Sequence, residues 1–273
     1  MTDHYAVMGN PIAHSKSPRI HTLFAEQTGQ DLEYSAILVE PGHFPEAVAA
    51  FHARGGRGLN ITVPFKQDAW TLASRRSERA ERAGAVNTLV LEHSGEHFGD
   101  NTDGAGLVRD LLHNHGATIK GKRLLLAGAG GAARGVLEPL LDEQPALLVI
   151  ANRTPGKAVE LARRFCELGR VEAGGFDALE GQTFDLVINA TAAGLSGTVP
   201  DLPAGVVGAG TWCYDMMYAD EPTAFVRWAG GHGAARALDG LGMLVEQAAE
   251  SFYLWRQVRP DTGTVIAALR VPS

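Results

Sequence analysis

The first hundred residues alternate between short apolar runs and apolar residues at helical spacing. The short runs predict strands at 5–9, 34–39 and 57–63, and spacings of three and four residues predict helices at 17–29 and 44–53. Parallel strands need long crossovers, and a helix is the usual crossover. This β-α-β-α-β order therefore predicts a mainly parallel sheet and an α/β fold.

The same alternation resumes after residue 103. A helix is predicted to residue 115, followed by a glycine-bounded turn at 116–121. Strands are then predicted at 123–127, 147–151, 184–190 and up to residue 215, and a long helix at 241–258. The second part of the chain is thus also α/β.

Length and composition limit the kind of protein. A chain of 273 residues is long enough for two domains, and two domains create a cleft. Hydrophobic residues form 45% and charged residues 20%, as in ordinary globular proteins. The net charge of -7 argues against nucleic-acid binding, which needs clustered Lys and Arg. We expect a small-molecule partner and no nucleic acid.

Several other classes of protein find no support in the sequence. Two cysteines, Cys166 and Cys213, are too few for a disulfide framework. The first residues lack a signal peptide pattern, and no apolar run approaches about 20 residues, so we expect a cytoplasmic protein without membrane contact. His93 and His97 fall in a predicted hairpin, and no His-Glu-x-x-His motif indicates a metal site.

A glycine turn follows the strand predicted at 123–127 and precedes a helical pattern. Gly128 permits a tight turn, Gly130 allows the backbone to approach a pyrophosphate, and Ala133 allows close helix packing. The alternative is a glycine-rich turn without ligand, but the strand, turn and helix order favours a dinucleotide site.

The end of the next predicted strand bears on the choice of cofactor. An NAD site usually has an Asp or Glu there, which binds the ribose. Here Asn152, Arg153 and Thr154 follow the strand, with Lys157 close behind. Arg153 can contact a 2′-phosphate, so the sequence predicts NADP rather than NAD; the alternative is a solvated arginine.

Polar residues cluster around position 60. Asn60 and Thr62 share one face if the strand continues, because side chains alternate along a strand. Pro64 ends the strand, and Lys66 can begin a helix facing the same cleft. A lone lysine is otherwise most often a solvated surface residue.

Three further residues have two interpretations each. Asp103 lies between the two alternating blocks and can be a helix N-cap or a catalytic group. Ser15 and Ser17 precede Pro18, which is also an ordinary helix start. No Gly-x-Ser-x-Gly motif supplies a nucleophile for acyl transfer.

Taken together, these segments resemble the shikimate dehydrogenase family, whose members reduce 3-dehydroshikimate with NADPH in aromatic amino-acid biosynthesis. The resemblance covers nearly the whole chain. It rests on the segments at 9–18, 60–66, 85–88, 101–104, 128–135, 152–154, 214–218 and 240–247.

The resemblance implies a discontinuous architecture. A Rossmann-type NADP-binding domain, residues 103–239, would be inserted into an N-terminal parallel-sheet substrate domain, residues 1–102, which C-terminal helices at 240–273 complete.

The resemblance also implies roles for particular residues. Ser15, Ser17 and Tyr218 would hold the substrate carboxylate. Thr62, Asn87, Asp103 and Gln247 would meet its hydroxyl groups, and Asn60 and Lys66 would also belong to the substrate-binding residues. Lys66 and Asp103 would form the acid/base pair at the reacting C3 oxygen, where an ammonium stabilises the charge that develops during reduction.

The same resemblance implies a set of cofactor contacts. The pyrophosphate would lie on Gly128, Ala129, Gly130, Gly131 and Ala132, and the adenosine phosphate on Asn152, Arg153, Thr154 and Lys157. Thr191 would lie nearby, and the nicotinamide would lie against Met216, Gly240 and Met243.

Two departures from the family pattern affect the cofactor loops. Ala192 and Ala193 stand where serines are frequent, and Leu238 where a small polar residue is common. Two rival functions also remain open: a quinate/shikimate dehydrogenase and a non-catalytic nucleotide-sensing homologue. Lys66 and Asp103 argue against the second. Monomer and homodimer are both compatible with the sequence.

Overall fold

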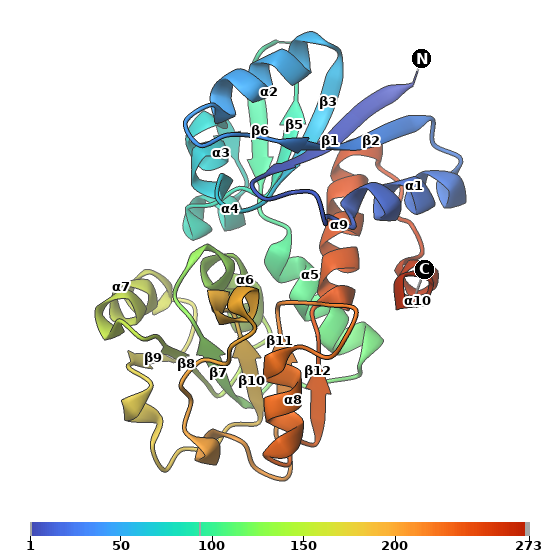
Figure 1. Ribbon diagram of the computed structural model, residues 1–273. Helices are drawn as coiled ribbons and strands as arrows, with labels where there is room; N and C mark the ends of the chain where they lie inside the picture. The colour runs from blue at the N-terminus through green and yellow to red at the C-terminus, as the bar shows by residue number, and fades with distance from the viewer. Residues whose placement is uncertain (1, 93, 271–273) are drawn as a thin grey trace. The chain divides into compact units, whose positions relative to one another are not determined.

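A computed structural model describes residues 2–92 and 94–270, which form two compact units (Figure 1). The first unit comprises residues 2–106 and 245–270, and the second comprises residues 107–244. The boundaries fall within helix α5 (Asp103–Arg109) and helix α9 (Leu241–Arg256). His93 and residues 271–273, which belong to the predicted hairpin and C-terminal segment, lie outside the described residues. The predicted α/β class is confirmed.

The sheet of the first unit has six strands in the order β2-β1-β3-β5-β6-β4. Their bounds are β1 (Asp3–Gly9), β2 (Leu32–Leu38), β3 (Gly56–Ile61), β4 (Arg75–Arg76), β5 (Thr88–Leu91) and β6 (His97–Asp100). β1 pairs in parallel with β2 and β3, but β5 is antiparallel to β3 and β6. β4 pairs in parallel with β6. β3 and β5 are antiparallel although two helices lie between them in the chain, and the short connection between β5 and β6 allows only a hairpin.

Helices cover both faces of this sheet. They are α1 (Ser17–Thr28), α2 (Phe44–Ala53), α3 (Lys66–Leu72), α4 (Glu78–Ala83) and α10 (Thr262–Arg270), with part of α9. Phe44 and Val48 of α2 join Ala6 and Met8 of β1 in one buried cluster. Elsewhere Phe24 of α1 meets Phe252 of α9 edge to face, with ring centroids 5.6 Å apart.

The sheet of the second unit is parallel throughout, in the order β12-β11-β10-β7-β8-β9. Its strands are β7 (Arg123–Ala127), β8 (Leu147–Ala151), β9 (Val171–Gly174), β10 (Leu186–Asn189), β11 (Trp212–Asp215) and β12 (Arg236–Leu238). β7 and β8 are apolar and almost wholly buried, as expected for strands covered on both faces.

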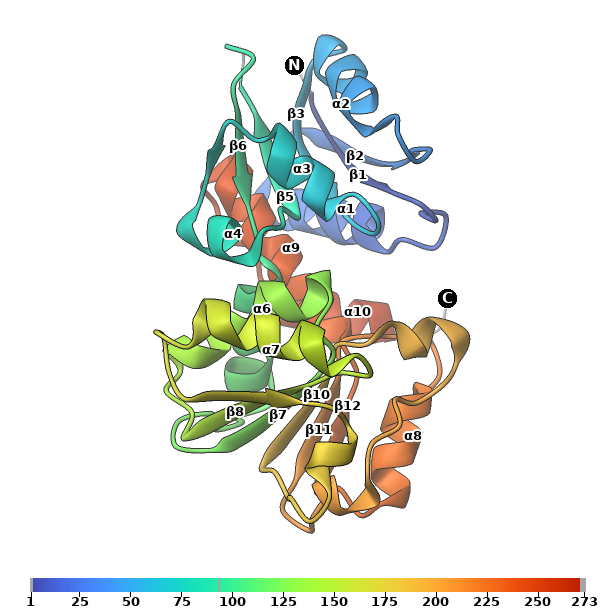
Figure 2. The same cartoon turned by 90° about the vertical axis from the view of Figure 1, so that its left-hand side faces the viewer.

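Alternate residues of β7 face different helices. Leu124 and Leu126 pack in one cluster with α6 (Gly131–Asp142) and α7 (Pro155–Phe165), whereas Leu125 packs in another with Phe225 of α8 (Ala224–Gly231). Figure 2 shows α6 and α7 together over one face of the sheet. The carboxyl ends of β7, β8, β10 and β11 therefore share one edge, from which their loops leave.

Several helix and strand ends differ in detail from expectation, and β1 and β2 each begin two residues earlier than predicted. β3 ends at Ile61, two residues before the predicted end, although the Thr62 amide still donates to Met8 O at 3.0 Å. The helix predicted at 103–115 is α-helical over Asp103–Arg109 and π-helical over Asp110–Asn114.

His21 is a buried histidine in the interior of the first unit. It lies on α1, and its ring stacks on Tyr34 with centroids 4.1 Å apart. Neither ring nitrogen meets a partner at hydrogen-bonding geometry among the described residues. Burial lowers the pKa of His21 to about 3, partly opposed by the nearby Asn60 side chain.

We expect His21 to make folding sensitive to mild acid. The folded pKa lies below the unfolded value near 6.5, so stability is complete above pH 6.5 and declines as the pH falls toward 3. Between pH 7 and pH 5 the wild type should lose about 2 kcal/mol more unfolding free energy than His21→Phe. Urea unfolding at both pH values measures the difference, and parallel losses in the two proteins would contradict it.

Candidate active site

Lys66 and Asp103 form an ion pair in the first unit. Lys66 is the first residue of α3 and Asp103 the first residue of α5. Lys66 Nζ lies 2.5 Å from Asp103 Oδ2, and the side chains are 21% and 8% exposed. The predicted helix start at Lys66 is correct, but the solvated-surface alternative is wrong, because the ammonium is mostly covered and held by a carboxylate.

Asn87 holds the other oxygen of Asp103. Its Nδ2 donates to Asp103 Oδ1 at 2.8 Å, and its Oδ1 accepts from the Thr102 amide at 2.9 Å. Its backbone carbonyl accepts from Ile61 N at 2.7 Å, at the end of β3. Asn87 is almost fully buried, so these contacts fix its amide. Asp103 therefore starts α5 as expected while its side chain bonds to Lys66 and Asn87.

Gln247 joins this group from α9. Its Oε1 accepts from Asn87 Nδ2 at 3.2 Å and from Thr102 Oγ1 at 3.4 Å. With Oε1 turned toward these donors, the amide nitrogen is the end of Gln247 that can donate to a ligand. Residues 160 positions apart in the sequence thus meet in one polar group.

Asn60 and Thr62 differ in their surroundings. Asn60 is buried in β3, where its amide bonds to Tyr34, Ser251 and Thr88. Thr62 lies just past the strand and is half-buried. A Cβ on Gly9 would lie only 2.4 Å from Thr62 Cγ2, so the glycine allows Thr62 to approach β1.

Ser15 and Ser17 lie at the start of α1. Ser15 is half-buried, and its Oγ accepts from Ser17 N at 3.3 Å. Ser17 is buried near Tyr34, where burial raises the pKa of the Tyr34 hydroxyl and Ser17 partly opposes that rise. Pro18 occupies the first turn of the helix, as expected. The helix-start interpretation is therefore correct for Ser17, the first residue of α1, whereas Ser15 precedes the N-cap residue Lys16; a role in binding stays open for both serines.

The loop that leads to Asp103 is anchored by Asp100. Arg79 of α4 donates to both oxygens of Asp100, at 2.7 and 2.5 Å, and Asn101 N donates to Oδ1. Burial opposes ionisation of Asp100, but Arg79 and Ser77 outweigh it and hold the carboxyl pKa below its usual value. Asn101 Oδ1 then accepts from Asp103 N at 3.2 Å, which fixes the start of α5.

The second unit contains the predicted glycine turn. Gly128 has a φ of 115°, and a Cβ there would lie 2.9 Å from Ala190 O, so only glycine fits. A Cβ on Gly130 would meet nothing within 4 Å, so this side of the turn is open. α6 begins at Gly131, and Ala129 and Ala132 flank it half-buried. The first amides of α6 can therefore face an anion.

The loop after β8 presents a cationic surface. Arg153 and Lys157 are exposed, and Thr154 precedes α7. Asn152 Nδ2 donates to Thr154 O at 3.0 Å, and Asn152 N donates to Gly174 O at 3.1 Å. These bonds hold the backbone and leave the side chains of Arg153 and Lys157 at the surface.

The remaining predicted cofactor residues also belong to the second unit. Thr191 follows β10, and its hydroxyl bonds to Asn189 Oδ1 at 2.7 Å. Gly240 is buried, and a Cβ there would lie 2.5 Å from Met216 O, so the glycine allows close approach of the two backbones. Met243 is buried, whereas Met216 and Tyr218 are half-buried.

The departures from the family pattern lie where they can affect the loop after β10. Thr191 Oγ1 accepts from Ala193 N at 3.3 Å, which caps the turn Ala192–Ser196. Ala192 is exposed, and Leu238 is half-buried at the end of β12. Neither alanine supplies a hydroxyl, so the loop is held by Thr191 alone among these three side chains.

Sequence reasoning missed three polar residues around Asn60, of which Tyr34 is half-buried. Tyr34 is on β2, Thr88 begins β5 and Ser251 is on α9. Thr88 and Ser251 are fully buried. The available signal was a hydroxyl residue among apolar neighbours in an otherwise buried element, which does not indicate its partner.

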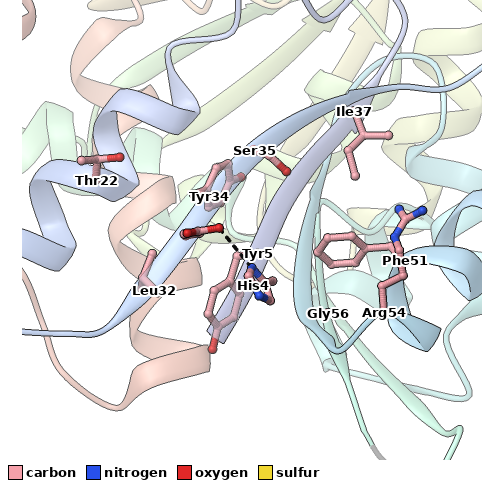
Figure 3. A pocket seen from close by; sticks show the side chains of 11 residues that line it. His4, Tyr5, Thr22, Leu32, Tyr34, Ser35, Ile37, Phe51, Arg54 and Gly56 are labelled. Atoms are coloured by element: carbon pink, nitrogen blue, oxygen red, sulfur yellow. Dashed lines mark ion pairs between the residues drawn. The ribbon is translucent and has the colours of Figure 1, made fainter. Parts of the chain in front are cut away.

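The lining of a surface hollow of about 740 Å³ includes neither Lys66 nor Asp103. The hollow is lined by His4, Tyr5, Glu33, Tyr34, Phe51 and Arg54, among others (Figure 3). His4 Nδ1 and Glu33 Oε2 are 3.4 Å apart at its edge. None of the predicted site residues lines it, so it is not the predicted site.

Two observations concern other kinds of site. Across residues 2–92 and 94–270, no three His, Cys, Asp or Glu side chains are grouped closely enough to hold a metal ion. No helix in that part of the chain combines the length and apolar character needed to cross a membrane.

Comparisons with known proteins cover the whole chain. Family models match residues 7–89 (shikimate dehydrogenase substrate binding domain), 110–196 (shikimate / quinate 5-dehydrogenase) and 240–270 (shikimate 5'-dehydrogenase C-terminal domain). A curated relative from Alkalilimnicola ehrlichii, shikimate dehydrogenase (NADP(+)), is 62% identical over 270 residues, 99% of each chain.

Solved structures agree with this relationship. The crystal structure of an Ael1 enzyme from Pseudomonas putida is 48% identical, covers 99% of both chains and has a TM-score of 0.93. Shikimate 5-dehydrogenase from Thermus thermophilus, solved with NADP(H) and shikimate, is 33% identical and covers 98% of this chain and 99% of its own, with a TM-score of 0.86. The resemblance inferred from sequence motifs is confirmed, and the chain belongs to the shikimate dehydrogenase family.

Proposed function

We propose that this protein catalyses the reversible, NADPH-dependent reduction of 3-dehydroshikimate to shikimate, a step toward chorismate and the aromatic amino acids. The observation that carries the proposal is the Lys66–Asp103 pair, with Asn87 and Gln247 around it. A curated relative that is 62% identical carries the same activity in its name.

The first unit supplies the acid/base chemistry. During reduction the C3 carbonyl oxygen gains negative charge, and the Lys66 ammonium can stabilise that oxygen and donate a proton to it. Asp103 holds the Lys66 ammonium in place through their ion pair and can accept a hydrogen bond from the C3 hydroxyl. In the reverse direction the amine of Lys66 takes the proton back.

Neutral polar groups suit the other parts of the substrate. Asn87 and Gln247 present amides near Asp103, and Thr62 presents a hydroxyl from the end of β3. Ser15, Ser17 and Tyr218 would bind the substrate carboxylate. Asn60 would support this group from β3.

The second unit fits NADP. Gly128 and Gly130 leave an open turn at the start of α6, and Ala129, Gly131 and Ala132 provide the amides for a pyrophosphate. Arg153 and Lys157 offer positive charge to a 2′-phosphate where an NAD enzyme has a carboxylate. Asn152, Thr154 and Thr191 line the same edge, and Met216, Gly240 and Met243 would meet the nicotinamide. The bound cofactor supplies the hydride.

This division assigns the substrate mainly to the first unit and the cofactor to the second, which also contains Tyr218. Residues 1–102 and 240–273 would form the substrate domain, and residues 103–239 the NADP domain, within a few residues of the boundaries of the compact units. We further propose that the protein acts in the cytoplasm as a monomer or homodimer.

A spectrophotometric assay at 340 nm tests the proposed function. Purified protein is incubated with shikimate or quinate, each with NADP or NAD. We expect the highest kcat/KM with shikimate and NADP. Higher kcat/KM with quinate would favour a quinate/shikimate dehydrogenase, and no turnover with any pair, despite nucleotide binding, would favour the non-catalytic homologue.

We expect Ser15 and Ser17 to act on the substrate in addition to starting α1. Loss of a helix cap costs about 1 kcal/mol of stability, whereas loss of a substrate contact raises KM. Ser15→Ala and Ser17→Ala should therefore raise the KM for shikimate roughly tenfold, with the KM for NADP unchanged. If the variants lower only the melting temperature, the substrate role is wrong.

A further inference from the structure

Hydrogen bonds connect Tyr34 to Asp103 through the first unit. The hydroxyl of Tyr34 donates to Asn60 Oδ1 at 2.7 Å. The Asn60 amide nitrogen donates to Ser251 Oγ at 2.8 Å and to Thr88 Oγ1 at 3.2 Å.

The same series continues to the candidate acid/base pair. Thr88 Oγ1 donates to Asn87 Oδ1 at 2.9 Å, and Asn87 Nδ2 donates to Asp103 Oδ1 at 2.8 Å. The Thr102 backbone amide can only donate, and it bonds to Asn87 Oδ1 at 2.9 Å. The orientation of the Asn87 amide is therefore set, and its nitrogen must face Asp103.

Asn60 is held on all sides within this series. Its oxygen accepts from Tyr34, and its nitrogen has Ser251, Thr88 and the Asn87 carbonyl as acceptors. Its side chain is 6% exposed. Its two amide hydrogens have three acceptors in the protein, so the Asn60 amide is fixed within this series.

Ser251 connects these strands to α9. It is fully buried one turn after Gln247, and its hydroxyl donates to Gln247 O at 3.1 Å while accepting from Asn60. It also lies 2.7 Å from Thr88 Oγ1. A single hydroxyl thus joins β3, β5 and the helix that carries Gln247.

We propose that Ser251 and Tyr34 are positioning residues for the proposed reaction. The Tyr34 hydroxyl bonds to the oxygen of the Asn60 amide and the Ser251 hydroxyl to its nitrogen. Through Thr88 and Asn87 these bonds set the position of the Asp103 carboxylate. Asn60 then acts on Asp103 through Thr88 and Asn87.

Two single variants test the positioning role, which rests on the proposed function. Ser251→Ala removes one of the three acceptors of the Asn60 amide nitrogen. Tyr34→Phe removes only the hydroxyl that donates to Asn60 Oδ1 and keeps the ring that stacks on His21. We expect kcat/KM for shikimate to fall roughly tenfold in Ser251→Ala and several-fold in Tyr34→Phe, mainly through kcat. The KM for NADP should stay within about twofold of wild type, since the proposed NADP contacts belong to the second unit.

A matched control separates positioning from general stability. Thr28 of α1 donates a hydroxyl bond to Phe24 O at 2.6 Å and touches none of these residues. Thr28→Val should lower the melting temperature without changing kcat. If Ser251→Ala does not fold, the value of kcat/KM for Tyr34→Phe alone tests the positioning role, because this variant keeps the ring that stacks on His21.

A double variant tests whether Asn60 acts through this series. Asn60→Ala combined with Ser251→Ala should be no more than about twofold slower than Asn60→Ala alone, because both changes break the same connection. Multiplying effects would show that Asn60 acts on the substrate independently and would overturn the proposal. So would wild-type kcat/KM in the folded single variants.

Turnover by the wild-type protein distinguishes failure of the proposed function from failure of the positioning role. If the wild-type protein turns over neither shikimate nor quinate, the proposed function is rejected, and the positioning role falls with it. If the wild type is active and Ser251→Ala and Tyr34→Phe are equally active, only the positioning role is rejected.

Discussion

Replacing Lys66 with methionine is expected to lower kcat for shikimate by roughly 100-fold to 10,000-fold, the usual contribution of general acid/base catalysis. The ammonium meets charge that develops on the C3 oxygen, so it acts more strongly in the transition state than in the ground state. Methionine keeps much of the length of the side chain but none of its charge. Steady-state kinetics with folding checked by circular dichroism provide the measurement.

Lys120→Met is the matched control, because Lys120 is exposed and belongs to the second unit. It should retain wild-type kcat. Binding of NADPH to Lys66→Met should survive, since the proposed cofactor residues lie in the second unit. A folded Lys66→Met enzyme with near wild-type kcat would show that Lys66 is a bystander.

A variant of Asp103, the ion-pair partner of Lys66, provides a second test of the acid/base pair. Asp103 Oδ2 is 2.5 Å from Lys66 Nζ, so Asp103→Asn should also be slow. Residues that act as one unit give effects that do not multiply. The double variant should therefore lose less than the product of the two single losses.

Replacing Arg153 with alanine is expected to raise the KM for NADP by about 10-fold to 100-fold. A charge-assisted hydrogen bond to the 2′-phosphate contributes about 1.5 to 3 kcal/mol, and each 1.4 kcal/mol corresponds to about tenfold. NAD has no 2′-phosphate, so its KM should change little. The ratio of kcat/KM for the two cofactors is the decisive quantity.

Arg163 offers a control on α7, the helix that follows Arg153. It is exposed near the end of α7, away from the turn that carries Arg153. Arg163→Ala should leave both KM values unchanged. Equal effects of Arg153→Ala on NADP and NAD would remove the basis for assigning the 2′-phosphate to this residue.

Local patterns predicted the elements that carry the site. The strands at 123–127 and 147–151 and the helix at 44–53 have the predicted bounds, because each is a clear apolar run or period between turn residues. The start of a helix at Lys66 followed from Pro64. The glycine turn at Gly128 was recognisable because its backbone requires glycine.

Contacts between distant residues were not predictable in the same way. Ser251 and Asn60 are 191 positions apart, and nothing in either local pattern indicates the other. A hairpin was predicted around residues 93 and 97, but its antiparallel strands β5 and β6 were not placed in the mainly parallel sheet expected for the first unit, because crossover helices indicated only β1 to β3. Periodicity shows which face of an element is buried, but tertiary packing decides which polar groups meet there.

The backbone bonds after β8 bear on how this enzyme family can change its cofactor. Gly128 N donates to Ala151 O at 2.7 Å and Asn152 N to Gly174 O, so the main chain holds the loop. Arg153 and Lys157, which would choose between the two nucleotides, stay exposed and add little to the core. Selectivity and folding thus depend on different atoms. Substitutions at Arg153 and Lys157 can therefore change the preference for NADP or NAD during evolution with little effect on the stability of the sheet.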